Sequence, residues 1–231
     1  MKLKSDNLLT DKVIEVTSLL TSIVNNYAPA CFSSSFGAED MVLIDMIFKS
    51  APEIKVFTLD TGRLPQETYE LIQKITEYYH QPIYIYFPES GNVESYTKTY
   101  GPNGFYQSVE LRKKCCHIRK VLPLKRALLG KKSWITGMRR EQSITRKDLS
   151  LSEWDSEHKL KKFNPLITWT RDDVWDYIKK YNVPYNILHD RGYESIGCAP
   201  CTRAITVGED IRAGRWWWED ADTKECGLHK N

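Results

Sequence analysis

The sequence has no long hydrophobic run, and its 231 residues carry a net charge of only +3. No apolar stretch approaches the roughly 18 residues of a membrane-spanning helix. The small net charge gives no support for a nucleic-acid or membrane surface as partner, so local clusters of arginine matter more than the total. The opening "MKLKSDNLLTDK" lacks the apolar core and cleavage site of a secretory signal. We therefore expect a cytoplasmic protein without nucleic-acid or membrane partners.

The sequence also lacks an internal repeat and a low-complexity linker, but it does contain six cysteines. Thiols stay reduced in the cytoplasm, so we interpret the cysteines as metal ligands, nucleophiles or core residues before disulfides. Cys31 stands in an apolar segment and is expected in the core. The others are Cys115, Cys116, Cys198, Cys201 and Cys226.

Short β-rich runs alternate with helical patterns in the first part of the chain. Strands are predicted at 29–36, 53–60, 82–88 and 132–138, and helices at 38–50, 65–80 and 117–130, the last one interrupted at Pro123. This alternation predicts an α/β fold, with a parallel twisted sheet covered by helices on both faces.

We predict a single domain over 1–231, with a nucleotide-binding α/β core at 1–150. The pattern changes beyond this point, where one helix is predicted at 170–182 and glycines interrupt the rest. The segment 151–231 has too little apolar periodicity for a core of its own. We expect it to form a loop-rich, site-forming appendage that ends in a mobile tail.

The loops after the predicted strands hold the candidate ligand-binding residues, because ligands of such sheets gather at the carboxyl ends of the strands. "SSSFGAED" (33–40) offers hydroxyls and a glycine before a helix, which favours an anion. "LDTGR" (59–63) adds Asp60, a candidate partner for a ribose or base. "TGMRREQS" (136–143) adds Arg139, whose planar guanidinium suits phosphate. Together these loops favour an anionic nucleotide.

Two cysteine pairs, in "KKCCHIRK" (113–120) and "GCAPCT" (197–202), predict a cofactor site. Four cysteines suit a [4Fe–4S] cluster or a zinc ion. Adjacent side chains on a helix point about 100° apart, which favours the wider iron–sulfur cluster. A structural zinc site and a redox-active CxxC dithiol are the alternatives. Lys120 lies one helical turn beyond Cys116, where it can stand between cluster and substrate.

The C-terminal segment contains two arginines and a last cysteine. Arg212 and Arg215 are three residues apart, on one face if the segment is helical. Cys226 follows in "KECGLHKN", at a chain end of the kind that is usually poorly ordered. An exposed unpaired cysteine is normally a liability, so we interpret Cys226 as functional.

Together these motifs resemble those of one family, the iron–sulfur adenylyl-sulfate (APS) reductases of sulfate assimilation, relatives of the 3′-phosphoadenylyl-sulfate (PAPS) reductases. The motifs "SFGAED", "LDTGR", "KKCC", "TGMRREQS", "NPLITWT", "GCAPCTR", "RAGRWWWE" and "ECGLH" occur in family order. The resemblance implies the adenine-nucleotide α-hydrolase-like fold, a modified pyrophosphate-loop (PP-loop) fold. "SFGAED" departs from the SGGxDS of its ATP-using members, in agreement with a family that does not cleave ATP.

The resemblance also implies the chemistry. Cys226 would be the catalytic nucleophile, and Cys115, Cys116, Cys198 and Cys201 would hold one [4Fe–4S] cluster per subunit. APS would be reduced to sulfite and AMP through an S-sulfocysteine, with thioredoxin or a glutaredoxin-like dithiol as reductant, in cysteine biosynthesis. The expected substrate residues, including those from the strand-end loops, are Ser33, Ser34, Ser35, Leu59, Asp60, Lys120, Gly137, Arg139, Arg212, Arg215 and His229.

Other functions stay open at this point. PAPS-specific relatives typically lack both cysteine pairs, which favours APS here, although a PAPS-preferring enzyme or one that accepts both is possible. A sulfate-adenylylating enzyme of the same fold would have no use for Cys226. An iron–sulfur or zinc electron-transfer module would bind no APS. A homo-oligomer is equally open.

Overall fold

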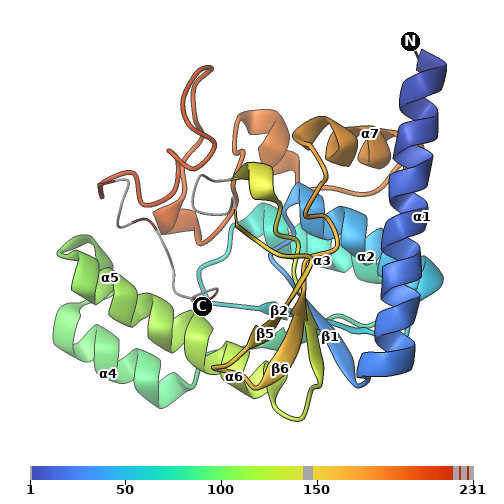
Figure 1. Ribbon diagram of the computed structural model, residues 1–231. Helices are drawn as coiled ribbons and strands as arrows, with labels where there is room; N and C mark the ends of the chain where they lie inside the picture. The colour runs from blue at the N-terminus through green and yellow to red at the C-terminus, as the bar shows by residue number, and fades with distance from the viewer. Residues whose placement is uncertain (1, 143–147, 221–223, 225–227, 229–231) are drawn as a thin grey trace.

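The computed structural model describes residues 2–142, 148–220, 224 and 228, with side chains from residue 8 onward. A six-stranded sheet crosses the molecule in the order β3-β2-β1-β4-β6-β5 (Figure 1). Neighbouring strands are parallel, except for the antiparallel pair β5 and β6 at one edge. The strands are β1 (Ala30–Ser34), β2 (Lys55–Leu59), β3 (Tyr84–Tyr86), β4 (Ser133–Ile135), β5 (Ser152–Asp155) and β6 (Leu160–Phe163). The predicted α/β fold is confirmed.

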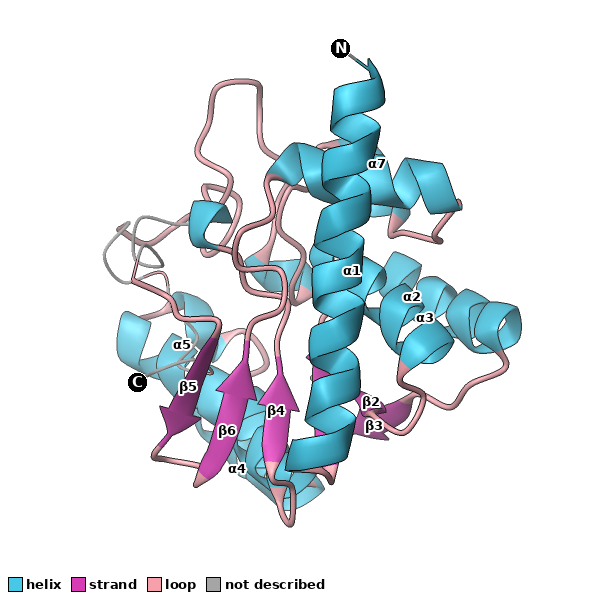
Figure 2. Ribbon diagram, turned by 45° about the vertical axis from the view of Figure 1, so that its right-hand side comes forward, coloured by secondary structure: helices cyan, strands magenta, loops and turns pink. Residues whose placement is uncertain are grey.

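Helices cover both faces of this sheet. They are α1 (Lys2–Tyr27), α2 (Ala38–Ser50), α3 (Gln66–Tyr79), α4 (Ser90–Tyr100), α5 (Val109–Cys116), α6 (Leu122–Leu128) and α7 (Arg171–Tyr181). Figure 2 shows α1 lying across the front of the sheet, with α4 and α5 behind it. None of the described helices combines the length and the apolar character that crossing a membrane requires.

Each strand supplies side chains to two separate cores, because successive residues of a strand point to opposite faces. In β1, Phe32 joins the large core formed with α1, α2, α3 and α7, whereas Cys31 packs with Leu124 and Leu128 of α6. Cys31 is fully buried and its thiol donates to the Ser133 carbonyl at 3.6 Å. Burial raises its pKa to about 12. The prediction that Cys31 is a core residue is confirmed.

The sheet continues beyond the predicted boundary at residue 150. β6 pairs with β4 in parallel register, with Ser133 opposite Lys161, and β5 closes this edge. The chain from 152 to 163 is therefore part of the α/β layer. Helix α1 was not predicted, although Leu9, Val16 and Leu20 recur on one helical face and are buried.

The helical run around the cysteine pair differs from the prediction of one helix broken at Pro123. α5 ends at Cys116, a π-helical turn spans His117–Val121, and α6 then continues with Pro123 near its start. Pro123 has no N–H to donate to the carbonyl four residues earlier. The preceding turn widens, and the Leu122 N–H bonds to the His117 carbonyl, five residues back. This wide turn carries Lys120, and such turns are frequent at functional sites.

Candidate active site

A cavity of about 260 Å³ lies at the carboxyl ends of β1, β2 and β4, between the helices of the two faces. Strand order alone predicts this position, because these parallel strands end at the same edge of the sheet. The cavity brings together nine of the predicted substrate residues: Ser33, Ser34, Ser35, Leu59, Lys120, Gly137, Arg139, Arg212 and Arg215. Cys226 and His229 lie outside the described residues.

The serine loop, residues 33–36, already uses several of its own polar groups. The Ser35 hydroxyl donates to the Asp40 carboxylate at 2.8 Å, and the Ser35 N–H donates to the same oxygen. The Phe36 N–H donates to the Ser34 hydroxyl at 3.0 Å. Phe36 is fully buried at a φ of 60°, which holds the sharp turn in place. A carboxylate from α2 thus occupies a position where this kind of loop could hold an anion.

Asp60 is buried beside the cavity but is not among its lining residues. Its carboxylate accepts hydrogen bonds from the Gly62 N–H at 2.7 Å and from the Tyr69 hydroxyl at 2.8 Å. Burial, together with this carboxylate, raises the pKa of Tyr69 to about 12. Asp60 therefore stabilises the turn after β2, and its predicted contact with a ribose or base has no support in this geometry.

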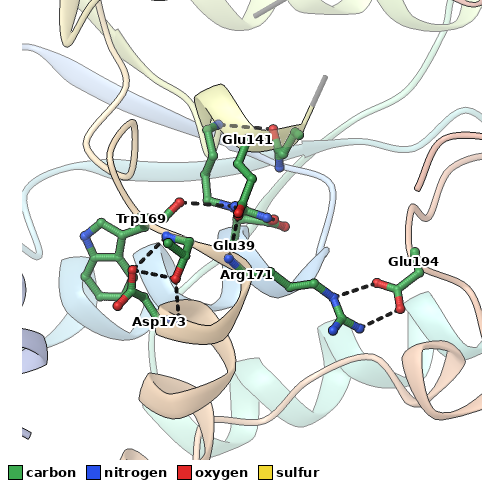
Figure 3. Close-up of polar contacts among 9 residues, drawn as sticks. Glu39, Glu141, Trp169, Arg171, Asp173 and Glu194 are labelled. Carbon is green, nitrogen blue, oxygen red and sulfur yellow. Dashed lines mark hydrogen bonds and ion pairs between the residues drawn. The ribbon is translucent and has the colours of Figure 1, made fainter. Parts of the chain in front are cut away.

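Arg139 lies in a network of ion pairs at the cavity wall, and its partners Glu39 and Glu141 are labelled in Figure 3. Its guanidinium, 3% exposed, pairs with Glu39 of α2 at 2.8 Å and with Glu141 at 2.8 Å. It also donates to the Trp169 carbonyl at 3.1 Å. Arg171, at the start of α7, forms a two-pronged pair with Glu194 at 2.6 and 3.2 Å. The predicted phosphate ligand Arg139 is thus bound by protein carboxylates.

Arg215 has a different environment. Its Nη1 makes only long contacts, with the Ser195 hydroxyl at 3.5 Å and the Ile196 carbonyl at 3.3 Å. Its buried Nε has no hydrogen-bond partner among the described residues. The guanidinium stacks over Trp216, with 4.7 Å between its carbon and the ring centroid. Arg215 therefore lines the cavity with a guanidinium that few protein groups engage.

Arg212 lines the same cavity and donates to the Lys224 carbonyl at 3.0 Å. Leu228, the other described residue of the tail, lines the cavity and packs against the α6 core. Lys224 and Leu228, the described residues on either side of Cys226, thus contact an arginine of the cavity and the cavity itself, respectively.

The four paired cysteines line one small cavity next to the first. Cys115 and Cys116 come from the end of α5. Cys198 directly precedes the 3₁₀ turn Ala199–Cys201, and Cys201 is the last residue of that turn. None of them forms a disulfide. Their sulfurs pack with Phe105 and Trp216, which shield the site from water.

This donor set fits a [4Fe–4S] cluster, because thiolates are its usual ligands. Arg63, Arg112, Arg119 and Lys120 line the same cavity and can offset the charge of such a cluster. Among the described residues, no three histidine, cysteine or acidic side chains are grouped as ligands of one metal ion.

The surroundings act differently on these thiols. Burial raises the pKa of Cys115, and it raises the pKa of Cys201 to about 12. Burial acts in the same direction on Cys198. There, however, the positive charge of Lys120 and a hydrogen bond to Thr61 at 3.2 Å, with other cations, outweigh it and lower the pKa. Of Cys115, Cys198 and Cys201, Cys198 is the thiol that its surroundings favour as a thiolate.

Several cavity residues were not identified by the sequence analysis. His189, Arg171, Glu39 and Glu194 line the cavity but come from separate elements. His189 packs edge-to-face on Trp175 and has a buried Nε2 without a partner among the described residues. Burial lowers its pKa despite the nearby carboxylates. Glu39 lies within the quoted motif "SSSFGAED", but nothing in that motif shows that it meets Arg139, because only the tertiary structure brings these residues together.

The sheet order, the cavity at the strand ends and the strand-end loops define an α/β nucleotide-binding fold of the PP-loop type. The structure resembles that of yeast FAD synthetase in complex with FAD, with a TM-score of 0.57 and 12% identity over 86% of this chain and 67% of that one. That likeness shows the fold alone.

The family follows from closer relatives. The phosphoadenosine phosphosulfate reductase domain family matches residues 29–204, and the chain belongs to this family. The adenosine 5′-phosphosulfate reductase of Allochromatium vinosum is 51% identical over 99% of this chain and 89% of its own length. The crystal structure of the phosphoadenylyl-sulfate (PAPS) reductase from Candida auris, a phosphate complex, has a TM-score of 0.71. It is 30% identical and covers 82% of this chain and 90% of that one.

Proposed function

We propose that the protein reduces APS to sulfite and AMP, with Cys226 as nucleophile and thioredoxin or a similar dithiol as electron donor, in the assimilation of sulfate. One observation carries this proposal. The cavity at the strand ends contains Lys120, Arg212 and Arg215, and the described tail residues that flank Cys226 contact this cavity or its arginines. The names of the relatives agree with this reaction.

The first step joins Cys226 to the sulfuryl group. The thiolate attacks the sulfur atom, a new S–S bond forms, and the S–O bond to the phosphate of AMP breaks. AMP leaves with the electron pair of that bond, and Cys226 becomes an S-sulfocysteine.

The second step uses the dithiol. One thioredoxin thiolate attacks Sγ of Cys226, and sulfite leaves with the S–S bonding pair. The second thiol then resolves the mixed disulfide. Cys226 is regenerated, thioredoxin is oxidised to its disulfide, and two electrons have passed to the sulfur of sulfite.

The cationic residues have a defined task in the first step, because a thiolate must approach an anionic group. Two unit charges 4 Å apart repel by about 4 kcal/mol at an effective dielectric constant of 20. Arg215 supplies a guanidinium whose Nε has no partner among the described residues, and Lys120 and Arg212 supply further positive charge. His229 is proposed to assist from the tail. The serine loop, Leu59 and Gly137 would hold the adenosine.

A [4Fe–4S] cluster would be held by Cys115, Cys116, Cys198 and Cys201, the donor set described above. When bound, it would contribute its charge to the electrostatic field of the substrate cavity without changing oxidation state. Lys120 lines both cavities and would couple the two.

The proposal is tested by mixing the protein with APS in the absence of thioredoxin and mapping its peptides by mass spectrometry. We expect one SO₃ unit on Cys226, its release as sulfite on addition of thioredoxin, and no adduct in Cys226→Ser. Cys31 is the internal control, since it is buried with a raised pKa and should stay unmodified.

Two results contradict the proposal: full activity of Cys226→Ser, or an active protein that forms no adduct. Truncation after Lys224 separates the tail from the fold. We expect it to abolish sulfite release while iron content and the circular dichroism spectrum stay unchanged.

A further inference from the structure

We propose that the protein selects APS over PAPS by electrostatic exclusion. Carboxylates on the adenosine side of the cavity bind the guanidinium groups that would otherwise receive a ribose 3′-phosphate. This inference rests on the proposed function, because it takes the phosphosulfate to lie at Lys120, Arg212 and Arg215. PAPS differs from APS by one phosphate, which adds about two negative charges.

The first wall of the cavity, the cationic wall, comprises Lys120, Arg212 and Arg215. Lys120 comes from the helices on one face of the sheet, and the arginines come from the C-terminal loops. Lys120 and Arg215 both lower the pKa of Cys198, so they share one neighbourhood. No carboxylate among the described residues pairs with Arg215. This wall can accept the charge of the phosphosulfate.

The second wall, the paired wall, comprises Glu39, Arg139, Arg171 and Glu194. Figure 3 shows the pair of Arg171 with Glu194. It is built from α2, the loop after β4, the start of α7 and the loop that carries Glu194, and α2 and α7 pack together on the other face of the sheet. Glu39 and Glu194 both act on the pKa of His189, which places these carboxylates in one neighbourhood. Glu39 also lies against Gly137, which is proposed to hold the adenosine, so we take the paired wall as the adenosine side of the cavity.

The cations of the paired wall are already bound. Arg139 donates from Nε and Nη2 to Glu39, and from Nη1 to Glu141 and to the Trp169 carbonyl. Arg171 donates from Nε and Nη2 to the carboxylate of Glu194. A phosphate could bind Arg139, or the Nε–Nη2 edge of Arg171, only by displacing a carboxylate from it. Arginine binds phosphate well because two N–H groups of its planar guanidinium reach two oxygens at once. In the paired wall, carboxylates already occupy these N–H groups.

The charges on this wall do not sum to a positive value. Its two carboxylates and two guanidinium groups cancel, and Glu141, which pairs with Arg139 from outside the cavity lining, adds one negative charge beside them. His189 adds no positive charge at neutral pH, because burial lowers its pKa. The serine loop is likewise engaged by the Asp40 carboxylate. A 3′-phosphate would meet like charge, whereas a 3′-hydroxyl can donate a hydrogen bond to a carboxylate.

The test measures binding, so that it does not depend on turnover. AMP and adenosine 3′,5′-bisphosphate differ only in the 3′-phosphate, and their dissociation constants are obtained by calorimetry on the cluster-loaded protein. The variants are Glu39→Gln, Glu194→Gln and the double variant, each of which removes one or two negative charges and keeps the side-chain shape. The matched control is Glu67→Gln, because Glu67 pairs with Arg191 at 2.6 Å but does not line the cavity.

We expect the wild type to prefer AMP. Each single variant should shift the ratio of the two dissociation constants toward the bisphosphate by roughly tenfold, the double variant by more, and the control by less than twofold. High salt should reduce the preference of the wild type. If Glu39→Gln does not fold, Glu194→Gln decides, since its side chain is 29% exposed and its loss is easily tolerated.

Two outcomes overturn the inference: equal affinity of the wild type for both nucleotides, or a shift in the variants no larger than in the control. Sulfite release from APS is measured in parallel. A shifted ratio without sulfite release would support the selectivity and count against the reaction, whereas sulfite release with an unshifted ratio would do the reverse.

Discussion

Replacement of Arg112 by methionine is expected to destabilise the protein strongly. Arg112 of α5 is fully buried and donates to Glu219 from Nε at 2.8 Å and from Nη2 at 2.6 Å. Its guanidinium also stacks over Trp216, at 4.6 Å from the ring centroid. This pair joins the helix of the cysteine pair to the chain that leads into the tail.

The expected loss follows from burial. With Arg112 removed, the Glu219 carboxylate, 2% exposed, stays buried without its partner. Breaking a buried ion pair in this way costs about 3–5 kcal/mol. For a chain of this length, 1 kcal/mol corresponds to roughly 2–4 °C, so the melting temperature should fall by about 6–20 °C.

The assay is urea and thermal unfolding, with iron content measured in parallel. Arg191→Met is the control, because Arg191 pairs with Glu67 at the surface, and exposed pairs contribute at most about 1 kcal/mol. Adding Glu219→Leu to Arg112→Met should restore much of the loss, since no unpaired charge then remains. A loss in Arg112→Met no larger than in Arg191→Met would refute the reasoning.

Three further predictions concern the core and the cavity. Gly137→Ala should weaken AMP binding and lower the free energy of unfolding by about 1–3 kcal/mol, because the added Cβ would overlap the Asp40 carboxylate. Calorimetry measures the dissociation constant of AMP and urea unfolding measures the stability; wild-type values of both would contradict this prediction. Asp45→Asn should lower the free energy of unfolding, measured in urea, by about 2–3 kcal/mol. The buried Asp45 carboxylate accepts hydrogen bonds from the hydroxyls of Tyr79 at 2.6 Å and Tyr177 at 2.7 Å. Stability should also fall as the pH rises above 10. Burial and Asp45 raise the pKa of both tyrosines, so the unfolded chain loses protons that the folded chain keeps. The double variant Tyr79→Phe, Tyr177→Phe should lose most of this dependence of stability on pH. A decrease above pH 10 as steep as in the wild type would argue against the explanation.

Much of the fold could be predicted because its signals are local. The strands at residues 30–34 (ACFSS) and 55–59 (KVFTL) are short β-prone segments with adjacent buried residues, as expected of parallel strands covered on both faces. The short strand at 152–155 has no such run, and it forms only because β6 offers an edge. The π-helical turn could not be placed either, because it depends on how Pro123 is accommodated within a packed helix.

The candidate site divides in the same way. The residue types at the strand ends and the two cysteine pairs could be recognised along the chain, because motif spacing is a local property. Which guanidinium groups are bound depends on the packing of distant segments. Arg139 and Arg215 cannot be told apart by residue type. Arg139 pairs with Glu39, which lies 100 residues away in the sequence, whereas no carboxylate among the described residues pairs with Arg215. Charge pairing depends on distance in space, and distances between remote segments are set by packing.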